Sequence, residues 1–335
     1  MIKIKSARDL GPQLTDNPHQ MVGQDGAYSI PLGDKTLWFF GDTLIGERVQ
    51  GESIWYPNGK AVGPWDMSGK GSIRRMINNT GLVTGINTGR NGLIDYKYIC
   101  ESNGELKQLI PLENHEHPDQ HRIWCMHGIQ IGEKIYLAFI KVRMIEEGPF
   151  PVNFEIVGSG LSVGSSDDWS FRRIVQNSDD IIWKENEPQL GSAFLSDPQN
   201  DWIYLYGVKK NQDGVQQCYI SRVHHQEIED RKGYQFLSDS LPYWSSNLND
   251  AIPIFNGPPN ELSISFNGYL NSYLAVHSLN LTGKIVARTS PNPWGFGANR
   301  LNCGWPVQIE KKHYRILHSF MPGRNTHHLT RKKER

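Results

Sequence analysis

Two aspartates near the start of the chain could supply a pair of carboxylates for catalysis. Asp25 and Asp42 lie in QDGAYSIPLGDKTLWFFGDT, residues 24–43, where two runs rich in aromatic and β-branched residues flank a Gly-Asp turn at 33–34. If this turn is the centre of an even-length loop, the residue numbers of two directly opposed residues add up to 67. Asp25 then faces Asp42, and directly opposed residues have Cβ atoms about 4.5–5.5 Å apart.

Such a pair is unfavourable in a hairpin, because like charges at directly opposed positions destabilise it. Gly26 and Gly41 flank the two aspartates and leave the backbone open. The pattern therefore favours two carboxylates kept for acid/base or nucleophilic work. The alternative is that both aspartates are turn residues at the ends of a hairpin, and a single bulge would shift the register. The same register predicts that Tyr28 faces Phe39.

The composition argues against several classes of function. Lys+Arg and Asp+Glu both total 35, so the net charge is zero and no global field attracts nucleic acid or an anionic membrane. No apolar run reaches 18 residues, so we expect no transmembrane helix. The N-terminus lacks an apolar signal core, which predicts a cytoplasmic protein as given, or a secreted or periplasmic one if an export signal has been removed.

The hairpin pattern recurs along the chain and predicts the elements that must position the aspartates. Segments 126–142, 191–210, 261–280 and 305–320 each combine an apolar run, a tight turn and a β-rich run. No long stretch has a 3.6-residue apolar period, so helices should be few. Five such units predict an all-β fold, a five-bladed β-propeller, with a two-sheet sandwich as the alternative.

We expect a single domain over residues 1–335, with a propeller core from about 20 to 320 and a basic tail at 321–335. The innermost strand of each blade lines the central channel of a propeller. Asp25 opens the first of these strands, so it should lie near the channel mouth.

Residues beside the other predicted inner strands are candidates to join the two aspartates. They are Glu187 as a general acid, and Asn79, Trp124, His127, Glu261 and Arg288 as substrate-binding residues. The histidine could also act as a proton shuttle near neutral pH. Each candidate also has a simpler interpretation. The two glutamates could be solvated loop carboxylates, and the asparagine could be a turn residue at a strand start. The histidine could face the channel without a chemical role, and the arginine could hold the loop that follows it.

Metal and cofactor motifs are sparse in the sequence. His115, His117 and His121 have acidic neighbours, as in a metal site, but the break at Pro118 and the high polarity favour a solvated loop. There is no P-loop, GxGxxG, HExxH or GxSxG motif. We expect no metal at the catalytic site and no cofactor, with a structural cation in the central channel left as an open alternative.

The opening stretch also resembles a known family. GQDGAYSIPLGDKTLWFFGDT is similar to the DG…S…G…LW.FGDT motif of the DUF4185 family, and RIWCMHGIQIGEKIYLAF, GSAFLSDPQNDWIYLYG, NELSISFNGYLNSYLAV and IVARTSPNPWG match it too. The resemblance covers about residues 20–300. It implies a five-bladed propeller similar to endo-acting D-arabinofuranases, and more widely to arabinanases and β-xylosidases. It also implies catalytic roles for Asp25 and Asp42. The ending HSFMPGRNTHHLTRKKER departs from the family's HPEL-like segment and closing strand.

These observations predict a glycoside hydrolase acting on a furanose-containing glycan such as arabinan, with an oligo- or polysaccharide as partner. One alternative is a non-catalytic glycan-binding propeller, which needs only aromatic platforms such as Trp55, Trp65 and Trp124. Another is a propeller that binds a protein.

The predicted spacing of the pair also predicts a mechanism. Retaining glycosidases separate two carboxyl groups by about 5–5.5 Å, and inverting ones by about 6.5–9.5 Å. The pair therefore predicts retention, with Asp25 as nucleophile and Asp42 as acid/base. An acid from across the channel, Glu187 or Glu261, would predict inversion.

Overall fold

The computed structural model describes residues 10, 13–14, 18–47, 72–85, 92–93, 95–145, 154–197, 199–241, 243–279, 285–296 and 307–309. Within these ranges the protein is all-β, with no α-helix and three single turns of 3₁₀ helix: η1 (His225–Glu227), η2 (Arg231–Gly233) and η3 (Leu248–Asp250). None of the helices in the described part is long and apolar enough to cross a membrane.

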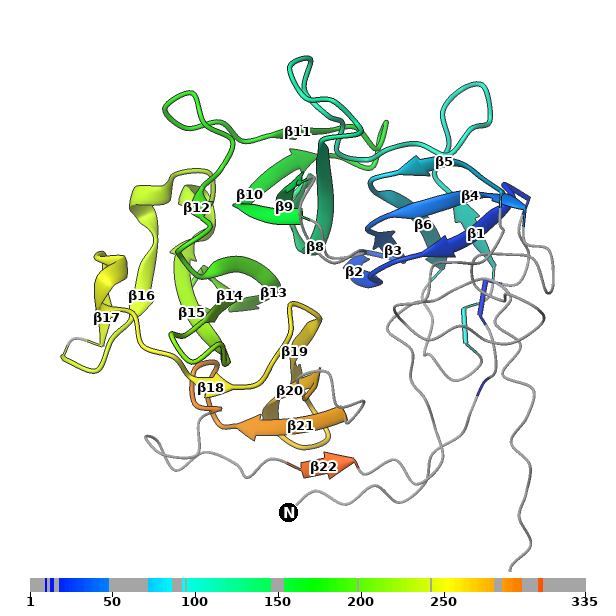
Figure 1. The fold of residues 1–335 in the computed structure, drawn as a ribbon. Coiled ribbons are helices and arrows are strands. Elements are labelled where there is room, and N and C mark those ends of the chain that lie inside the picture. Colours follow the sequence, from blue (N-terminus) through cyan, green and yellow to red (C-terminus); the bar gives the residue numbers. More distant parts are fainter. Residues whose placement is uncertain are drawn as a thin grey trace, which may run out of the picture.

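Four antiparallel sheets stand around a common centre, in the manner of propeller blades (Figure 1). Blade 1 contains β2 (Tyr28–Leu32), β3 (Lys35–Phe40), β6 (Thr80–Gly85) and β7 (Tyr96–Tyr98). Blade 2 contains β8 (His121–Ile131), β9 (Lys134–Met144), β10 (Phe154–Gly164) and β11 (Phe171–Arg173), with β12 (Trp183–Lys184) paired to β10.

Blade 3 contains β13 (Gln189–Asp197), β14 (Trp202–Lys210), β15 (Gln216–His224), β16 (Gln235–Leu237) and β17 (Trp244–Ser245), with β18 (Phe255–Asn256) paired to β15. Blade 4 contains β19 (Leu262–Asn267), β20 (Ser272–Ser278), β21 (Ile285–Ser290) and β22 (Val307–Ile309). The first hairpin of each blade falls where the repeated sequence pattern predicts it.

The predicted fifth unit is only partly within the described residues. Its start, β22, pairs with β21 and is the outer strand of blade 4, which corrects its assignment as the opening of a new blade. Residues 310–320, the tail at 321–335, Trp55 and Trp65 lie outside the described residues. The count of five blades and the single-domain assignment therefore stay predictions.

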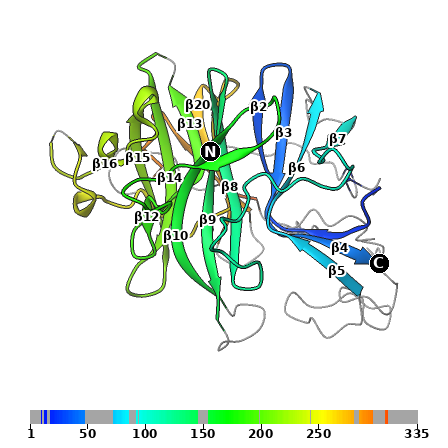
Figure 2. The ribbon, with the colours of Figure 1, turned by 90° about the horizontal axis from the view of Figure 1, so that it is seen from above.

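The hairpin at the start of the chain has the predicted register. Tyr28 pairs with Phe39, and Leu32 pairs with Lys35 across the two-residue turn, in which Gly33 has the positive φ of 60° that such a turn favours. The same strands continue beyond the hairpin as a three-stranded sheet of β1 (Met21–Gln24), β4 (Thr43–Glu47) and β5 (Ser72–Ile77). Figure 2 shows β4 and β5 turning away from the direction of β3 and β6.

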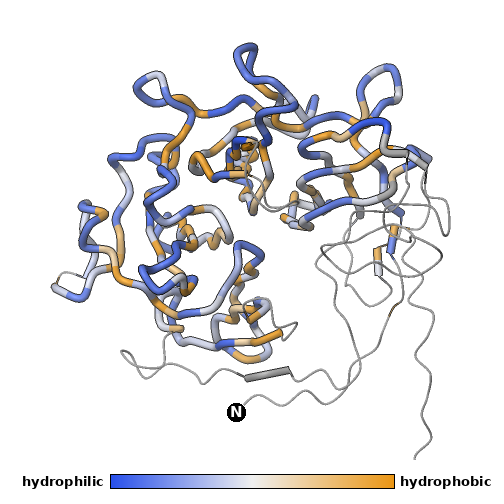
Figure 3. Tube along the Cα trace, viewed as in Figure 1, coloured by the Kyte–Doolittle hydropathy of each residue, from blue (hydrophilic) through white to orange (hydrophobic). Residues whose placement is uncertain are grey.

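Hydrophobic side chains fill the spaces between successive blades. On β9, Leu137 and Phe139 pack toward blade 1, whereas Ala138 and Ile140 pack toward blade 3. A middle strand of a blade is thus buried on both faces, which explains the unbroken apolar run of residues 135–140. Apolar positions gather along the strands, and the outer loops are mostly hydrophilic (Figure 3). Burial of each such large side chain contributes about 1.5–3 kcal/mol.

Candidate active site

A break in the strands of blade 1 holds Asp25 and Asp42 together. Between β1 and β2, the N–H of Asp25 donates to the carbonyl of Asp42 at 2.9 Å, and the N–H of Gly41 donates to the carbonyl of Asp25 at 2.7 Å. Gly26 has φ of 59°, a left-handed conformation that glycine adopts without strain. The exposed Asp25 accepts the Gly26 N–H at Oδ1, at 2.8 Å. The two aspartates are therefore backbone neighbours, as the predicted register requires.

Asp42 lies in a drier environment than Asp25. Its side chain is half-buried, and Oδ1 is enclosed without a hydrogen-bond partner among the described residues. Burial raises the pKa of Asp42 from its ordinary 3.8 to about 7. The Trp124 indole and the Arg122 charge, both on β8, act in the opposite direction on this pKa, and the Asp25 charge adds to the rise.

The Trp124 ring packs against the break itself. Its Cδ1 would lie 3.8 Å from a Cβ placed on Gly41. The Trp124 Nε1–H faces Asp42 without reaching hydrogen-bond geometry, and it is buried with no other partner in the described structure. An enclosed donor, the Trp124 Nε1–H, and an enclosed acceptor, Asp42 Oδ1, therefore face each other at the carboxylate pair.

Tyr28 of blade 1 is close enough to a carboxylate of blade 4 to feel its charge. Its phenol, three residues after Asp25, is 8% exposed. Burial raises the pKa of Tyr28, and the charges of Glu261 and Asp25 raise it further. Glu261 is exposed and directly precedes β19. The charges of two carboxylates, one beside β2 and one beside β19, therefore act on the same buried phenol.

His127 fills the wall next to Tyr28. Its ring stacks on Phe194 with centroids 6.1 Å apart and meets the Tyr28 ring edge-on at 6.3 Å. Nδ1 accepts the Phe194 N–H at 3.3 Å. Burial lowers the pKa of His127 to about 4, so the ring is neutral near pH 7. This finding argues against a proton shuttle near neutral pH and leaves substrate binding by His127 as a prediction.

Asn79 lies beneath the site, fully buried. Its side-chain amide donates to the carbonyls of Ile110 and Ile123 at 3.1 and 3.0 Å, and its oxygen accepts the Ile110 N–H at 2.8 Å. Backbone groups thus occupy this amide, and the expectation that it binds a sugar hydroxyl finds no support. Instead Asn79 fixes the strand segment that carries Trp124.

Glu187 and Arg288 are also engaged by other groups of the protein. Glu187 accepts from Arg231 of η2 at 2.6 Å and from the N–H of Lys184 on β12 at 2.9 Å. Arg288 donates through Nε to His277 at 3.2 Å, and its guanidinium lies over the ring of Phe255. Glu187 is thus an ion-paired side chain and not the solvated loop carboxylate of the alternative. Arg288 connects its strand to His277 and Phe255. The catalytic role of Glu187 and the substrate-binding role of Arg288 stay predictions.

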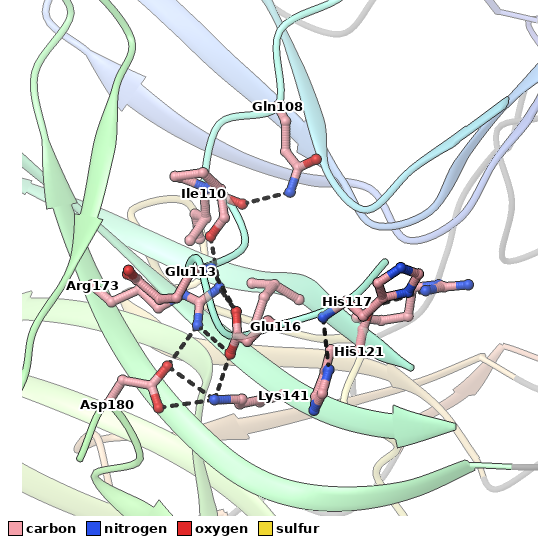
Figure 4. Close-up of polar contacts among 12 residues, drawn as sticks. Gln108, Ile110, Glu113, Glu116, His117, His121, Lys141, Arg173 and Asp180 are labelled. Carbon is pink, nitrogen blue, oxygen red and sulfur yellow. Dashed lines mark hydrogen bonds and ion pairs between the residues drawn. The ribbon is translucent and has the colours of Figure 1, made fainter. Parts of the chain in front are cut away.

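A buried ion cluster anchors the loop that leads into β8 (Figure 4). Arg173 donates to Glu116 and Asp180 at 2.7 Å, and Lys141 lies 3.2 Å from Asp180 and also contacts Glu116. Burial alone would raise the pKa of Glu116, but the hydrogen bonds from Arg173 and Lys141 outweigh it and hold the pKa at about 2. Arg173 also donates to the carbonyl of Pro111, next to the Ile110 that Asn79 binds.

The histidines of the same loop bind its own backbone. Nδ1 of His121 accepts the His117 N–H at 3.3 Å, and Nδ1 of His117 accepts the Asp119 N–H at 3.2 Å. His115 is exposed. No group of three or more potential metal-ligating side chains was found in the described part of the chain.

Sequence reasoning missed Arg122 and the role of Tyr28. Arg122 lies two residues before Trp124 on β8, and alternate residues of a strand share a face. That spacing could have indicated Arg122 once Trp124 was a candidate. Tyr28 could not be identified in this way, because its second carboxylate neighbour, Glu261, is more than 200 residues away in the chain.

The fold and the site define an all-β protein with blade-like sheets and a carboxylate pair where β1 passes into β2 and β3 into β4. The chain belongs to the DUF4185 family, described as a domain of unknown function, whose model matches residues 10–307. No curated protein matches the chain.

Solved structures of low sequence identity are similar to this chain. A proposed hydrolase from Bacteroides ovatus has a TM-score of 0.52 and 13% identity, over 85% of this chain and 72% of its own. A GH43_1 enzyme from Xanthomonas citri has a TM-score of 0.46 and 16% identity, over 85% and 74%. Zg3597, a family 117 glycoside hydrolase from Zobellia galactanivorans, has a TM-score of 0.45 and 10% identity, over 88% of this chain and 72% of its own. The first of these shows a shared fold and nothing further.

Proposed function

We propose that this protein is a glycoside hydrolase that cleaves a furanose-containing glycan such as arabinan. The observation that carries the proposal is the pairing of Asp25 with Asp42 at the strand break. One carboxyl is exposed, and the other is half-buried with its pKa raised to about 7. Two neighbouring carboxyls with different environments are what acid and nucleophile roles require. The furanose substrate class rests on the family's resemblance to D-arabinofuranases.

In the proposed reaction, Asp25 acts as nucleophile and Asp42 as acid/base. The Asp25 carboxylate attacks the anomeric carbon while Asp42 gives its proton to the departing glycosidic oxygen. In the second step Asp42 takes a proton from water, whose oxygen displaces Asp25 from the sugar. The reaction consumes one water for each bond cleaved and needs no cofactor. Because the first step needs protonated Asp42, kcat/KM should fall as the pH rises through about 7.

The direct test measures reducing ends released from a panel of arabinans by the wild type, Asp25→Asn and Asp42→Asn. Hydrolysis by the wild type, with losses of about 10²–10⁴-fold in each variant, supports the proposal. Full activity of either variant contradicts the assigned pair. Proton NMR at the start of hydrolysis gives the stereochemistry, and an initial product of inverted configuration would exclude the retaining scheme.

A second candidate acid is Glu261, because its charge and that of Asp25 both act on the Tyr28 phenol. Glu261 comes from another blade, so a water could enter between it and Asp25, as inversion requires. Loss of activity in Glu261→Gln with an inverted first product would favour this scheme over the Asp25–Asp42 pair.

A non-catalytic glycan-binding protein is the alternative function. The half-buried Trp124 could then serve as a stacking platform beside the enclosed polar groups. Glycan binding by the wild type without release of reducing ends, lost in Trp124→Ala and kept in Asp25→Asn, would establish this function instead.

A further inference from the structure

A chain of buried hydrogen bonds runs under the two aspartates. The side-chain amide of Gln24 donates to Thr80 Oγ1 at 3.2 Å, and Thr80 Oγ1 lies 2.8 Å from Thr43 Oγ1. Thr43 Oγ1 in turn makes a longer contact of 3.4 Å with the carbonyl oxygen of Gly41. All three side chains are at most 1% exposed. No substrate can therefore touch them.

Thr80 is the middle member of this chain. Its Oγ1 accepts from the Gln24 amide, and either hydroxyl can donate in the contact between Thr80 and Thr43. Connected hydrogen bonds of this kind polarise one another in a low-dielectric interior. Loss of the Thr80 hydroxyl leaves the Gln24 amide donor and the Thr43 hydroxyl without their shared partner.

The chain connects the peptide groups next to both aspartates. Gln24 directly precedes Asp25, and Thr43 directly follows Asp42. The Gly41 carbonyl belongs to the peptide bond that leads into Asp42. Thr80, from the third strand, connects the two sides at the level where β1 passes into β2 and β3 into β4.

Side-chain hydrogen bonds are needed here because the backbone pairing is interrupted. At the break, Asp25 donates to Asp42 but accepts from Gly41, so the two aspartates do not exchange a symmetric pair of hydrogen bonds. Two strands joined in this way could slide or twist against each other. The buried hydrogen bonds from Gln24 on β1 to Thr80 on β6 and from Thr80 to Thr43 on β4 oppose that motion.

We propose that Gln24, Thr43 and Thr80 are positioning residues that set the separation of the two carboxylates, a role that rests on the function proposed above. The competing explanation is that these three side chains only fill space at the strand break. In that case their replacement lowers the stability of the protein without a specific change in the titration of Asp42. The charged groups that face Asp42 are Asp25 on its own hairpin and Arg122 on β8.

The test compares Thr80→Val, which keeps the shape and removes the hydroxyl, with Thr80→Ser, which keeps the hydroxyl. Thr84→Val is the matched control, because Thr84 is on the same strand and its buried hydroxyl has no hydrogen-bond partner among the described residues. Two quantities are measured: kcat and KM on arabinan, and the titration of Asp42 by NMR of carboxyl-labelled aspartate, assigned with Asp42→Asn.

In Thr80→Val we expect kcat to fall at least about tenfold with KM nearly unchanged, because a small misplacement of reacting groups costs much rate. The Asp42 titration midpoint should move by at least about 0.5 in pH. Thr80→Ser should restore kcat to within about threefold of the wild type and the Asp42 midpoint to within about 0.2 in pH. Thr84→Val should have the kcat and the Asp42 midpoint of the wild type. An unchanged kcat and titration in Thr80→Val overturns the proposal, as does a failure of Thr80→Ser to recover them.

A second variant and the substrate-free titration can also contradict the proposal. If Thr80→Val does not fold, Gln24→Met removes only the first hydrogen bond of the chain, and the same criteria apply to it. If the wild type hydrolyses no glycan, the proposed function fails, but the Asp42 titration still decides the positioning role. A midpoint in Thr80→Val or Gln24→Met equal to that of the wild type then overturns it.

Discussion

The raised pKa of Asp42 has a consequence for stability that can be measured without any substrate. A carboxyl whose pKa is raised on folding stabilises the protein only while it is protonated. Its contribution is complete below pH 3.8 and is lost as the pH rises through about 7. The amide introduced by Asp42→Asn carries no charge at any pH. This variant should therefore be increasingly more stable than the wild type as the pH rises.

The magnitude follows from the two pKa values. Each pKa unit corresponds to about 1.36 kcal/mol, so the raised pKa of Asp42 lowers the free energy of unfolding by about 4 kcal/mol above pH 8 and by about 1.5 kcal/mol at pH 5. Because solvent reaches part of this half-buried side chain, we expect the wild type and Asp42→Asn to diverge by about 1–2.5 kcal/mol between pH 5 and pH 8.5.

The assay is urea unfolding of both proteins at several pH values in this range. Asp34→Asn serves as the matched control, because Asp34 is an exposed carboxyl in the turn of the same hairpin. Its free energy of unfolding should follow that of the wild type in parallel. Parallel curves for Asp42→Asn as well would refute the reasoning, since Asp42 would then be an ordinary solvated aspartate.

Two further predictions concern the buried groups around the site. Glu116→Gln removes one of the two carboxylates that Arg173 and Lys141 share, and leaves Asp180 alone to balance two buried cations. It should destabilise the protein by about 3–5 kcal/mol, measured by urea unfolding at pH 7. Because the pKa of Glu116 is lowered to about 2, this difference should shrink as the pH falls from 4.5 toward 2. His127→Phe keeps the ring packing and loses the hydrogen bond from the Phe194 N–H, so it should lower the free energy of unfolding by about 1–3 kcal/mol. The fall of kcat/KM as the pH rises through about 7 should remain in this variant. Loss of this fall in His127→Phe would show that the histidine titrates there after all.

The hairpin could be predicted because its information is local. Alternating apolar residues and a Gly-Asp turn determine which residues of β2 and β3 oppose each other, and the structure confirms that register. The hairpins of blades 2 to 4 were found for the same reason. The fifth unit was misassigned in part, because a three-residue outer strand such as β22 has no pattern of its own and is defined by its neighbour.

The site was harder to predict, because its contacts connect distant parts of the chain. Glu187 has an acidic side chain beside an inner strand, but Arg231, 44 residues later, engages it. Asn79 resembles a turn residue, and only the approach of Ile110 and Ile123 shows that its amide is occupied. The raised pKa of Asp42 depends on burial, which no sequence spacing encodes.

The strand break also limits how the length of this chain can change. Partner numbers sum to 67 in both β1–β4 and β2–β3, at Gln24–Thr43 and Tyr28–Phe39, so the break contributes equally to both strands. A single inserted or deleted residue within 25–27 or 40–42 would turn one side of the hairpin over and exchange its buried and exposed faces. Changes in this stretch that keep the fold should therefore be substitutions, or paired insertions on both strands.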